Sequence, residues 1–213
     1  MASAKTPEPR GAAAEPAGSE YLTVAAPAKA QLREKMSRFI AFVFPVSSAE
    51  QAREEIARVA ADYHDARHVC WAYRLGADGT DTQCNDNGEP SGTAGRPILG
   101  QIRSAGLTNV AVAVVRYFGG IKLGTSGLIT AYKEATRLAI EEAEIVTGFE
   151  TDTVTVVFPY MAINDVMRVA KDPGIRIVDQ VFDNSCLLTL EARADHVERL
   201  LQRLTDIDGV TEK

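Results

Sequence analysis

The residues best suited to chemistry gather around two glycine-rich loops, at positions 85–96 and 119–126. Glycine permits backbone conformations and close approaches that a side chain forbids. Each loop leads into an expected helix, and the free amides of a helix start attract anions. Arg96, Arg116 and Lys122 lie close enough in the sequence to add positive charge. The two loops therefore predict an anion-binding site.

Hydroxyl side chains stand at the start of both expected helices. In the first, Ser91 or Thr93 is expected to cap a helix that has Pro97 in its first turn. The second helix is expected to begin near Thr125 and Ser126. Its loop is not a Walker-type nucleotide site, because that motif requires Lys where Thr125 stands.

Cations at the ends of expected strands complete the predicted site. Arg67 and His68 come just before one strand, and Arg116 ends another. They could be ordinary strand-end charges that pair with Asp65, Asp86 or Glu89. We favour convergence on one cleft, where phosphate or an acidic partner segment could dock. The predicted anion or nucleic-acid site consists of Arg67, His68, Ser91, Thr93, Arg96, Arg116, Lys122, Thr125 and Ser126.

Two catalytic alternatives use some of the same residues. A hydrolase would draw on His68, Glu89 and Ser91, although neither loop contains the G-x-S-x-G motif of a nucleophile elbow. Zinc could bind at His68, Cys70 and Cys84, but the closely spaced cysteine pairs of structural zinc sites do not occur. We expect no metal, no cofactor and no NTP hydrolysis.

Four separated segments carry a recognisable signature. They read KMSRFI from Lys35, DARHVCWAY from Asp65, and then NDNGEPSGTAGRPIL and VAVVRYFGGIKLGTSGLITAY. In type and order these segments closely resemble the IMPACT family, including its bacterial YigZ-type members. The resemblance extends from about Tyr21 to the C-terminus. Asn87 stands where the family usually has Asp, and Ser126 where Gly is common.

The resemblance implies a fold and a theme. It implies a ribosomal-protein-type N-terminal domain and a C-terminal domain like the last domain of elongation factor G. The eukaryotic namesake of the family regulates translation by competing for a large partner that activates an initiation-factor kinase. Only the theme of translation carries over to bacterial relatives, and a shared fold alone does not establish function.

Charge limits the class of partner. The 213-residue chain has a net charge of -6 and a pI near 5.2, so it is not a uniformly basic nucleic-acid binder. The charge is uneven, however. Positions 85–137 carry six Lys or Arg against three Asp or Glu, whereas positions 150–213 carry seven against twelve. A basic face in the first part of the chain remains compatible with these counts.

The sequence also indicates a compartment. Cys70, Cys84 and Cys186 are scattered and odd in number, which fits a reducing environment better than a disulfide framework. No run of 18 apolar residues is present, and the acidic Glu8 and Glu15 are unlike a targeting segment. We expect a cytoplasmic protein without membrane contact, and the oligomeric state is left open.

The positions of the expected strands and helices predict an α+β protein of two domains. Residues 1–20 read as a disordered tail. Residues 21–147 should form an α/β sandwich in which the apolar strand 110–115 is buried on both faces. Residues 148–213 follow a β-α-β-β-α-β order, which is the ferredoxin-like pattern, with Asp195 capping the last helix. In the first domain we expect strands at 21–24, 37–44, 69–75 and 80–84 and a helix that is capped by Ser47 or Ser48 and runs to about residue 64.

The function best supported by these features is non-enzymatic regulation of translation. The glycine-rich cleft of the N-terminal domain would bind RNA, the ribosome or a translation-related protein. Two alternatives stay open. One is a small hydrolase acting on a phosphorylated or peptide-like substrate. The other is a protein-interaction module that acts through the acidic C-terminal domain.

Overall fold

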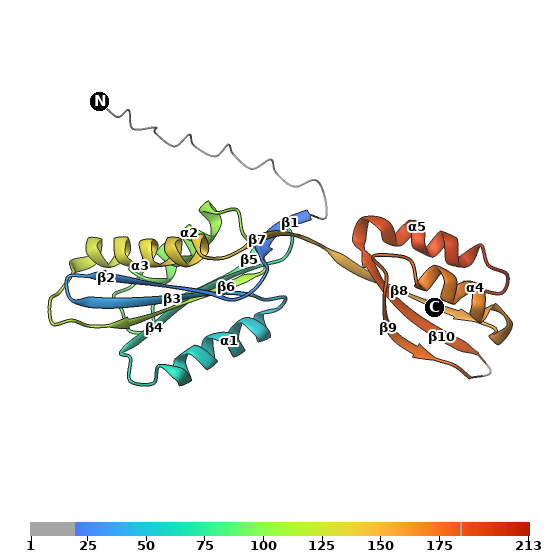
Figure 1. The fold of residues 1–213 in the computed structure, drawn as a ribbon, viewed down its shortest axis with the longest axis horizontal. Helices are drawn as coiled ribbons and strands as arrows, with labels where there is room; N and C mark the ends of the chain where they lie inside the picture. Colours follow the sequence, from blue (N-terminus) through green and yellow to red (C-terminus); the bar gives the residue numbers. More distant parts are fainter. Residues whose placement is uncertain (1–19, 184) are drawn as a thin grey trace, which may run out of the picture.

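The computed structural model describes residues 20–183 and 185–213, which form a mixture of five α-helices and β-sheets in two lobes (Figure 1). The expected mixed α and β composition is confirmed. The predicted tail at 1–20 lies outside the described residues except for Glu20, which is the first residue of a strand. No helix within the described ranges is both long and apolar enough to cross a membrane.

The first lobe is built on a five-stranded sheet in which all neighbouring strands are antiparallel. Its spatial order is β2-β3-β6-β4-β5. The strands are β2 (Ala28–Glu34), β3 (Ser37–Pro45), β6 (Val110–Tyr117), β4 (His68–Leu75) and β5 (Asp81–Asn85).

Helices cover both faces of this sheet. Helices α2 (Gly95–Ser104) and α3 (Gly124–Glu141) pack on one face, and α1 (Ala49–Asp62) packs on the other (Figure 1). Side chains alternate along β6, so Val110, Val112 and Val114 join the core under α2 and α3, while Ala111, Ala113 and Val115 join the core under α1. The prediction that this strand is buried on both faces is confirmed. Ser48 caps α1, as expected.

The pairing of β4 with β6 brings together the two strand ends at which the candidate site lies. β4 begins where β6 ends because the two strands are antiparallel, and their register places His68 opposite Arg116. In the alternation along β6, Arg116 falls on the same face as Val114, the face that α2 and α3 cover. Residues of the loops before α2 and α3 lie next to these strand ends.

A separate two-stranded sheet completes the first lobe. β1 (Glu20–Val24) pairs with β7 (Ile145–Phe149), which follows α3. β7 then leads almost directly into β8 (Thr151–Phe158), the first strand of the second lobe.

The second lobe has its own sheet and its own hydrophobic core. The strand order is β11-β8-β10-β9, and the core contains Phe158, Val166, Leu188 and Leu204. After β8 the elements are the short 3₁₀ helix η1 (Tyr160–Ala162), α4 (Ile163–Ala170), β9 (Arg176–Val181), β10 (Cys186–Arg193), α5 (Ala194–Thr205) and β11 (Thr211–Glu212). This is the predicted β-α-β-β-α-β order, with η1 added.

Two expectations about local structure were incomplete or wrong. No strand was expected at β2. Asp195 was expected to cap α5, but Arg193 occupies the N-cap position and makes no side-chain capping hydrogen bond. The Asp195 carboxylate instead pairs with the Arg193 guanidinium, with an Oδ2–Nη2 distance of 2.7 Å. An arginine so close offers the carboxylate a charged donor in place of a backbone amide.

Candidate functional site

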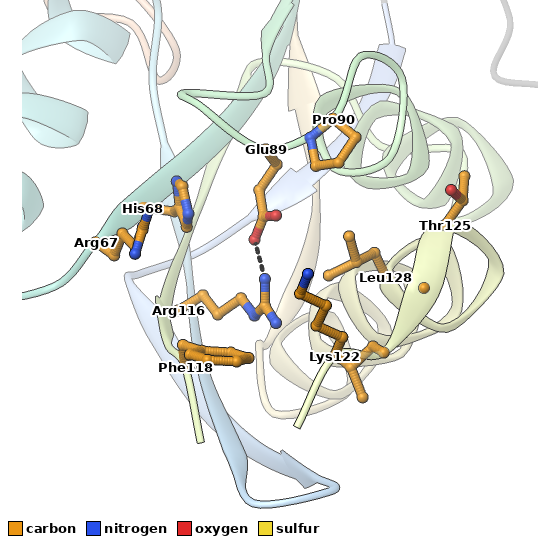
Figure 2. A pocket seen from close by; sticks show the side chains of 11 residues that line it. Arg67, His68, Glu89, Pro90, Arg116, Phe118, Lys122, Thr125 and Leu128 are labelled. Carbon is orange, nitrogen blue, oxygen red and sulfur yellow. Dashed lines mark hydrogen bonds and ion pairs between the residues drawn. The ribbon is translucent and has the colours of Figure 1, made fainter. Parts of the chain in front are cut away.

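A cleft of about 440 Å³ lies at the end of the sheet where β4 begins and β6 ends. Three stretches far apart in the sequence line it. They supply Arg67, His68, Glu89, Pro90, Arg116, Phe118, Lys122, Leu123, Gly124, Thr125 and Leu128. Figure 2 shows Glu89 and Arg116 in the centre, with Arg67 and His68 to one side and Lys122, Thr125 and Leu128 to the other. Three cations therefore share the cleft with a single carboxylate, that of Glu89.

The Glu89–Arg116 ion pair forms the floor of the cleft. Arg116 Nη1 donates to Glu89 Oε1 over 2.6 Å, and the side chains are only 7% and 3% exposed. The Tyr132 hydroxyl donates to the same carboxylate oxygen over 2.9 Å. Breaking such a buried pair leaves an uncompensated charge and is strongly destabilising. The expectation that Arg116 could be an ordinary paired charge is thus correct for this residue.

A buried polar network continues from this pair into the core. Cys70 Sγ lies 3.3 Å from Tyr132 Oη and 2.9 Å from the backbone oxygen of Asp86. Burial raises the pKa of the Cys70 thiol to about 12. Burial also raises the pKa of Tyr132, and the neighbouring Cys70 and Glu89 add to this shift. Both groups are therefore protonated at neutral pH and serve as structural hydrogen-bonding groups.

His68 is held in one orientation at the side of the cleft. Its Nδ1 lies 2.8 Å from the backbone oxygen of Asn87, so Nδ1 carries the proton and donates to this carbonyl. Asn87 has a left-handed backbone with φ of 40°, and its Nδ2 donates to the backbone oxygen of Val69 over 3.0 Å. A carboxylate at position 87 could not donate this bond. His68 Nε2 is left for other partners.

The N-terminus of α2 is already occupied by a carboxylate from the same chain. Asp86 accepts hydrogen bonds from the amides of Gly92, Ala94 and Gly95 over 2.8 to 2.9 Å. Burial of Asp86 acts in the opposite direction, but these three amides and the nearby Arg96 keep its pKa below the ordinary value. No anion site is therefore open at the start of α2.

The prediction that Ser91 or Thr93 caps α2 is wrong. Ala94 occupies the N-cap position, and no side chain of the cap residue bonds to the helix. Thr93 is buried and its hydroxyl donates to the Pro90 backbone oxygen over 2.6 Å, whereas Ser91 is exposed. Asp86 takes this role because its two carboxylate oxygens together accept all three amides, which is more than a single hydroxyl oxygen can accept.

The N-terminus of α3 is open by contrast. Leu123 occupies the N-cap position and makes no side-chain capping hydrogen bond, and among the described residues no other side chain accepts a hydrogen bond from the first-turn amides. Leu123, Gly124 and Thr125 all line the cleft, so the free amides at this helix start belong to its wall. Lys122 precedes them and, among the described residues, has no ion-pair partner. Positive charge and helix-start amides therefore meet on one side of the cleft.

The structure brings together part of the predicted set. Arg67, His68, Arg116, Lys122 and Thr125 line the cleft. Four predicted residues do not line it: Ser91, Thr93, Arg96 and Ser126. Ser126 borders another hollow beside Leu32 and Glu134.

Sequence reasoning missed several residues that line the cleft, namely Pro90, Phe118, Leu123, Gly124 and Leu128. Phe118 could have been found, because an aromatic residue that follows a buried strand and precedes two glycines is poorly placed to join the core.

The side chains proposed for a hydrolase or a zinc site are not arranged as either site requires. Ser91 does not line the cleft, His68 Nδ1 bonds to a backbone carbonyl, and Glu89 pairs with Arg116 and Tyr132. These three residues therefore do not form a Ser-His-acid relay. In the part of the chain that the structure describes, no three His, Cys, Asp or Glu side chains are close enough to share a metal ion.

Comparison with known sequences gives consistent results. The Impact N-terminal domain family matches residues 35–140. A protein from Escherichia coli called IMPACT family member YigZ is 31% identical over 188 residues, which cover 87% of this chain and 92% of the relative. An IMPACT family member from Haemophilus influenzae is 30% identical over 190 residues, with 88% and 92% covered. The Saccharomyces cerevisiae Protein IMPACT homolog is 30% identical over 123 residues, or 56% of this chain and 46% of that protein.

A solved structure shares the fold. A crystal structure of a hypothetical protein matches with a TM-score of 0.77 at 29% identity, over 92% of this chain and 97% of that one. This similarity spans both lobes.

Proposed function

The chain belongs to the IMPACT family, and we propose that it is a non-enzymatic cytoplasmic regulator of translation that binds RNA or the ribosome through the cleft. The observation that carries the proposal is the contrast between two helix starts. Asp86 fills the N-terminus of α2, whereas the N-terminus of α3 is uncapped and faces a cleft lined by Arg67, Arg116 and Lys122. Phosphate oxygens suit such a wall of amides and cations.

The link to translation comes from the family. The eukaryotic namesake of the family regulates translation, and the resemblance carries this theme to the present chain. The yeast Protein IMPACT homolog is related to this chain by sequence. We also propose that the boundary between domains lies near residues 147 and 148 and that the second domain is ferredoxin-like. Neither assignment decides the function, because such folds serve many roles.

Co-sedimentation with ribosomes and with RNA tests the proposal. Lys122→Glu and Arg67→Glu replace cations of the cleft that have no ion-pair partner among the described residues, so each should weaken binding while circular dichroism stays unchanged. Lys133→Glu is the matched control, because Lys133 is exposed on α3 but does not line the cleft. The slope of log affinity against log salt should change by about 0.7 for each lost contact to single-stranded phosphate.

Two outcomes would overturn the proposal. One is a wild-type protein that binds neither RNA nor ribosomes at low salt. The other is equal affinity of wild type and both folded cleft variants.

A protein-interaction role for the second lobe is a separate candidate. Val178 and Val181 lie on the edge strand β9 with Phe182 just after it, and each is 43 to 50% exposed. Edge strands with exposed apolar side chains favour contacts with other chains. Affinity capture with Val181→Lys against wild type tests this candidate. The candidate fails if every protein that wild type captures is also captured by Val181→Lys, or if wild type captures none.

A further inference from the structure

Phe118 is an aromatic residue that stays open to solvent inside the cleft. The residue is 47% exposed, although it follows directly on β6, which is buried as far as Arg116. The Arg116 guanidinium lies over its ring, 5.6 Å from the centroid, and also lies 5.5 Å from the centroid of the buried Phe39. Figure 2 shows the Phe118 ring next to the guanidinium. A ring supported in this way offers its free surface to another planar group.

Arg116 itself has unused hydrogen-bonding capacity. The residue is 6% exposed, and its Nε has no hydrogen-bond partner among the described residues. Buried polar groups nearly always have a partner, so an orphan donor at the floor of a cleft indicates an acceptor on a ligand. Glu89 engages only Nη1 and thus holds the guanidinium in position.

The cleft therefore offers two kinds of contact close to each other. Phe118 supplies a stacking surface, and Lys122 with the open start of α3 supplies a phosphate site, only a few residues further along the chain. A volume of about 440 Å³ suits a ligand the size of one nucleotide. A base inside a duplex is stacked on both sides and has no free face to stack on Phe118.

We propose that the cleft binds a single unpaired nucleotide, with the base stacked on Phe118 and a phosphate at the N-terminus of α3. This inference rests on the proposed function and specifies its ligand. The nucleotide could belong to a single-stranded segment of RNA or be a free mononucleotide, since both present the same base and phosphate.

Fluorescence anisotropy with a short labelled oligouridylate tests the inference on the full chain. Competitors are the unlabelled strand, an abasic strand of equal length, an RNA duplex and uridine monophosphate. The variants are Phe118→Ala, Phe118→Leu, Phe118→Tyr and Lys122→Glu, with Ile129→Ala as an exposed apolar control on α3 outside the cleft. Circular dichroism verifies that each variant is folded.

The expected pattern separates stacking from charge. Phe118→Ala and Phe118→Leu should weaken binding of oligouridylate about 5- to 100-fold, while Phe118→Tyr and Ile129→Ala bind like wild type. The abasic strand should bind equally to wild type and Phe118→Ala, and Lys122→Glu should weaken both strands. Competition by uridine monophosphate as strong as by the strand would identify a free nucleotide as the ligand.

Two results would overturn the inference in different ways. If Phe118→Ala binds as wild type does, or if duplex competes as well as single strand, while Lys122→Glu still weakens binding, then the stacked nucleotide is wrong and the proposed function stands. If wild type binds no RNA, the proposed function fails together with the inference.

Discussion

Asp86 stabilises a helix to which it does not belong. Its carboxylate accepts amides of Gly92, Ala94 and Gly95, and Asp86→Ala removes all three bonds. We expect the free energy of unfolding to fall by about 1–3 kcal/mol, measured by chemical denaturation. Asp86→Asn keeps an acceptor oxygen and should lose less. Asp81→Ala, at an exposed position on β5, is the control. A loss for Asp86→Ala no larger than that of the control would contradict the prediction.

The same carboxylate should make stability depend on pH. The pKa of Asp86 is lowered from an ordinary value of 3.8, so its contribution is complete above that value and is lost as the pH falls through the folded pKa. The difference in unfolding free energy between wild type and Asp86→Asn should therefore be largest at neutral pH and shrink below pH about 4. Denaturation curves across the acid range measure it. A difference that grows on acidification would show that Asp86 is not ionised in the folded protein.

Cys70 should be chemically inert in the folded protein. Burial raises its pKa to about 12, so almost no thiolate exists at neutral pH, and the thiolate is the reactive form. Cys186 is buried as well, whereas Cys84 is partly exposed. Intact-mass measurement after iodoacetamide treatment should show a first addition at Cys84 and full modification only in denaturant. Early modification of Cys70 would mean that the Tyr132–Glu89 network opens readily.

At the scale of elements, the loop after β6 packs tightly against the turn between β2 and β3. A Cβ at Gly119 would lie 2.0 Å from the Met36 backbone oxygen, whereas a Cβ at Gly120 would have no atom within 4 Å. Gly120 has φ of 86°, so Gly120→Ala should cost only backbone strain, about 1–2 kcal/mol. Gly119→Ala must displace the turn and should cost more. Chemical denaturation of both variants measures the order, and a reversed order would contradict it.

The elements that the sequence predicted are those with strong patterns. β6 begins with six apolar residues in a row, and β4 and β5 flank a turn with two glycines, so their positions were found. β2 was missed for a physical reason. Ala28, Ala30 and Leu32 alternate inward with period two, but two of the three are alanines and the whole strand consists of residues that favour helices. Its place in the sheet comes from pairing with β3 rather than from local preference.

The candidate site was predictable to the extent that strand order was predictable. Convergence of Arg67, His68 and Arg116 follows from antiparallel pairing of β4 with β6. The Asp86 cap was not predictable, because it reaches Gly95 across an irregular loop whose path no periodic pattern describes. The buried contacts of Glu89 with Arg116 and Tyr132 likewise depend on how α3 packs over the sheet.

At the scale of the whole molecule, the two lobes have separate sheets and separate hydrophobic cores. A few contacts hold the junction between β7 and β8. The Arg193 guanidinium lies 3.9 Å from the Phe149 ring centroid, and its Nη2 lies 3.6 Å from Glu20 Oε1. The next amide, that of Ala194, donates to the Glu150 backbone oxygen over 2.9 Å. Arg193 is thus the main side chain that ties the start of α5 to the end of the first lobe.

Limited digestion with a protease specific for Glu should therefore cut within residues 144–151, at Glu144 or Glu150, and leave two folded fragments. Separate cores make each fragment stable once the junction is cut.

Arg193→Ala removes the contacts with Phe149 and Glu20, so cleavage at Glu150 should become several-fold faster, as followed by mass spectrometry. Arg199→Ala, on the exposed side of α5, controls for the loss of a charge. An unchanged rate for Arg193→Ala would show that this contact does not restrain the junction, and stable fragments that end within residues 109–143 would place the domain boundary elsewhere.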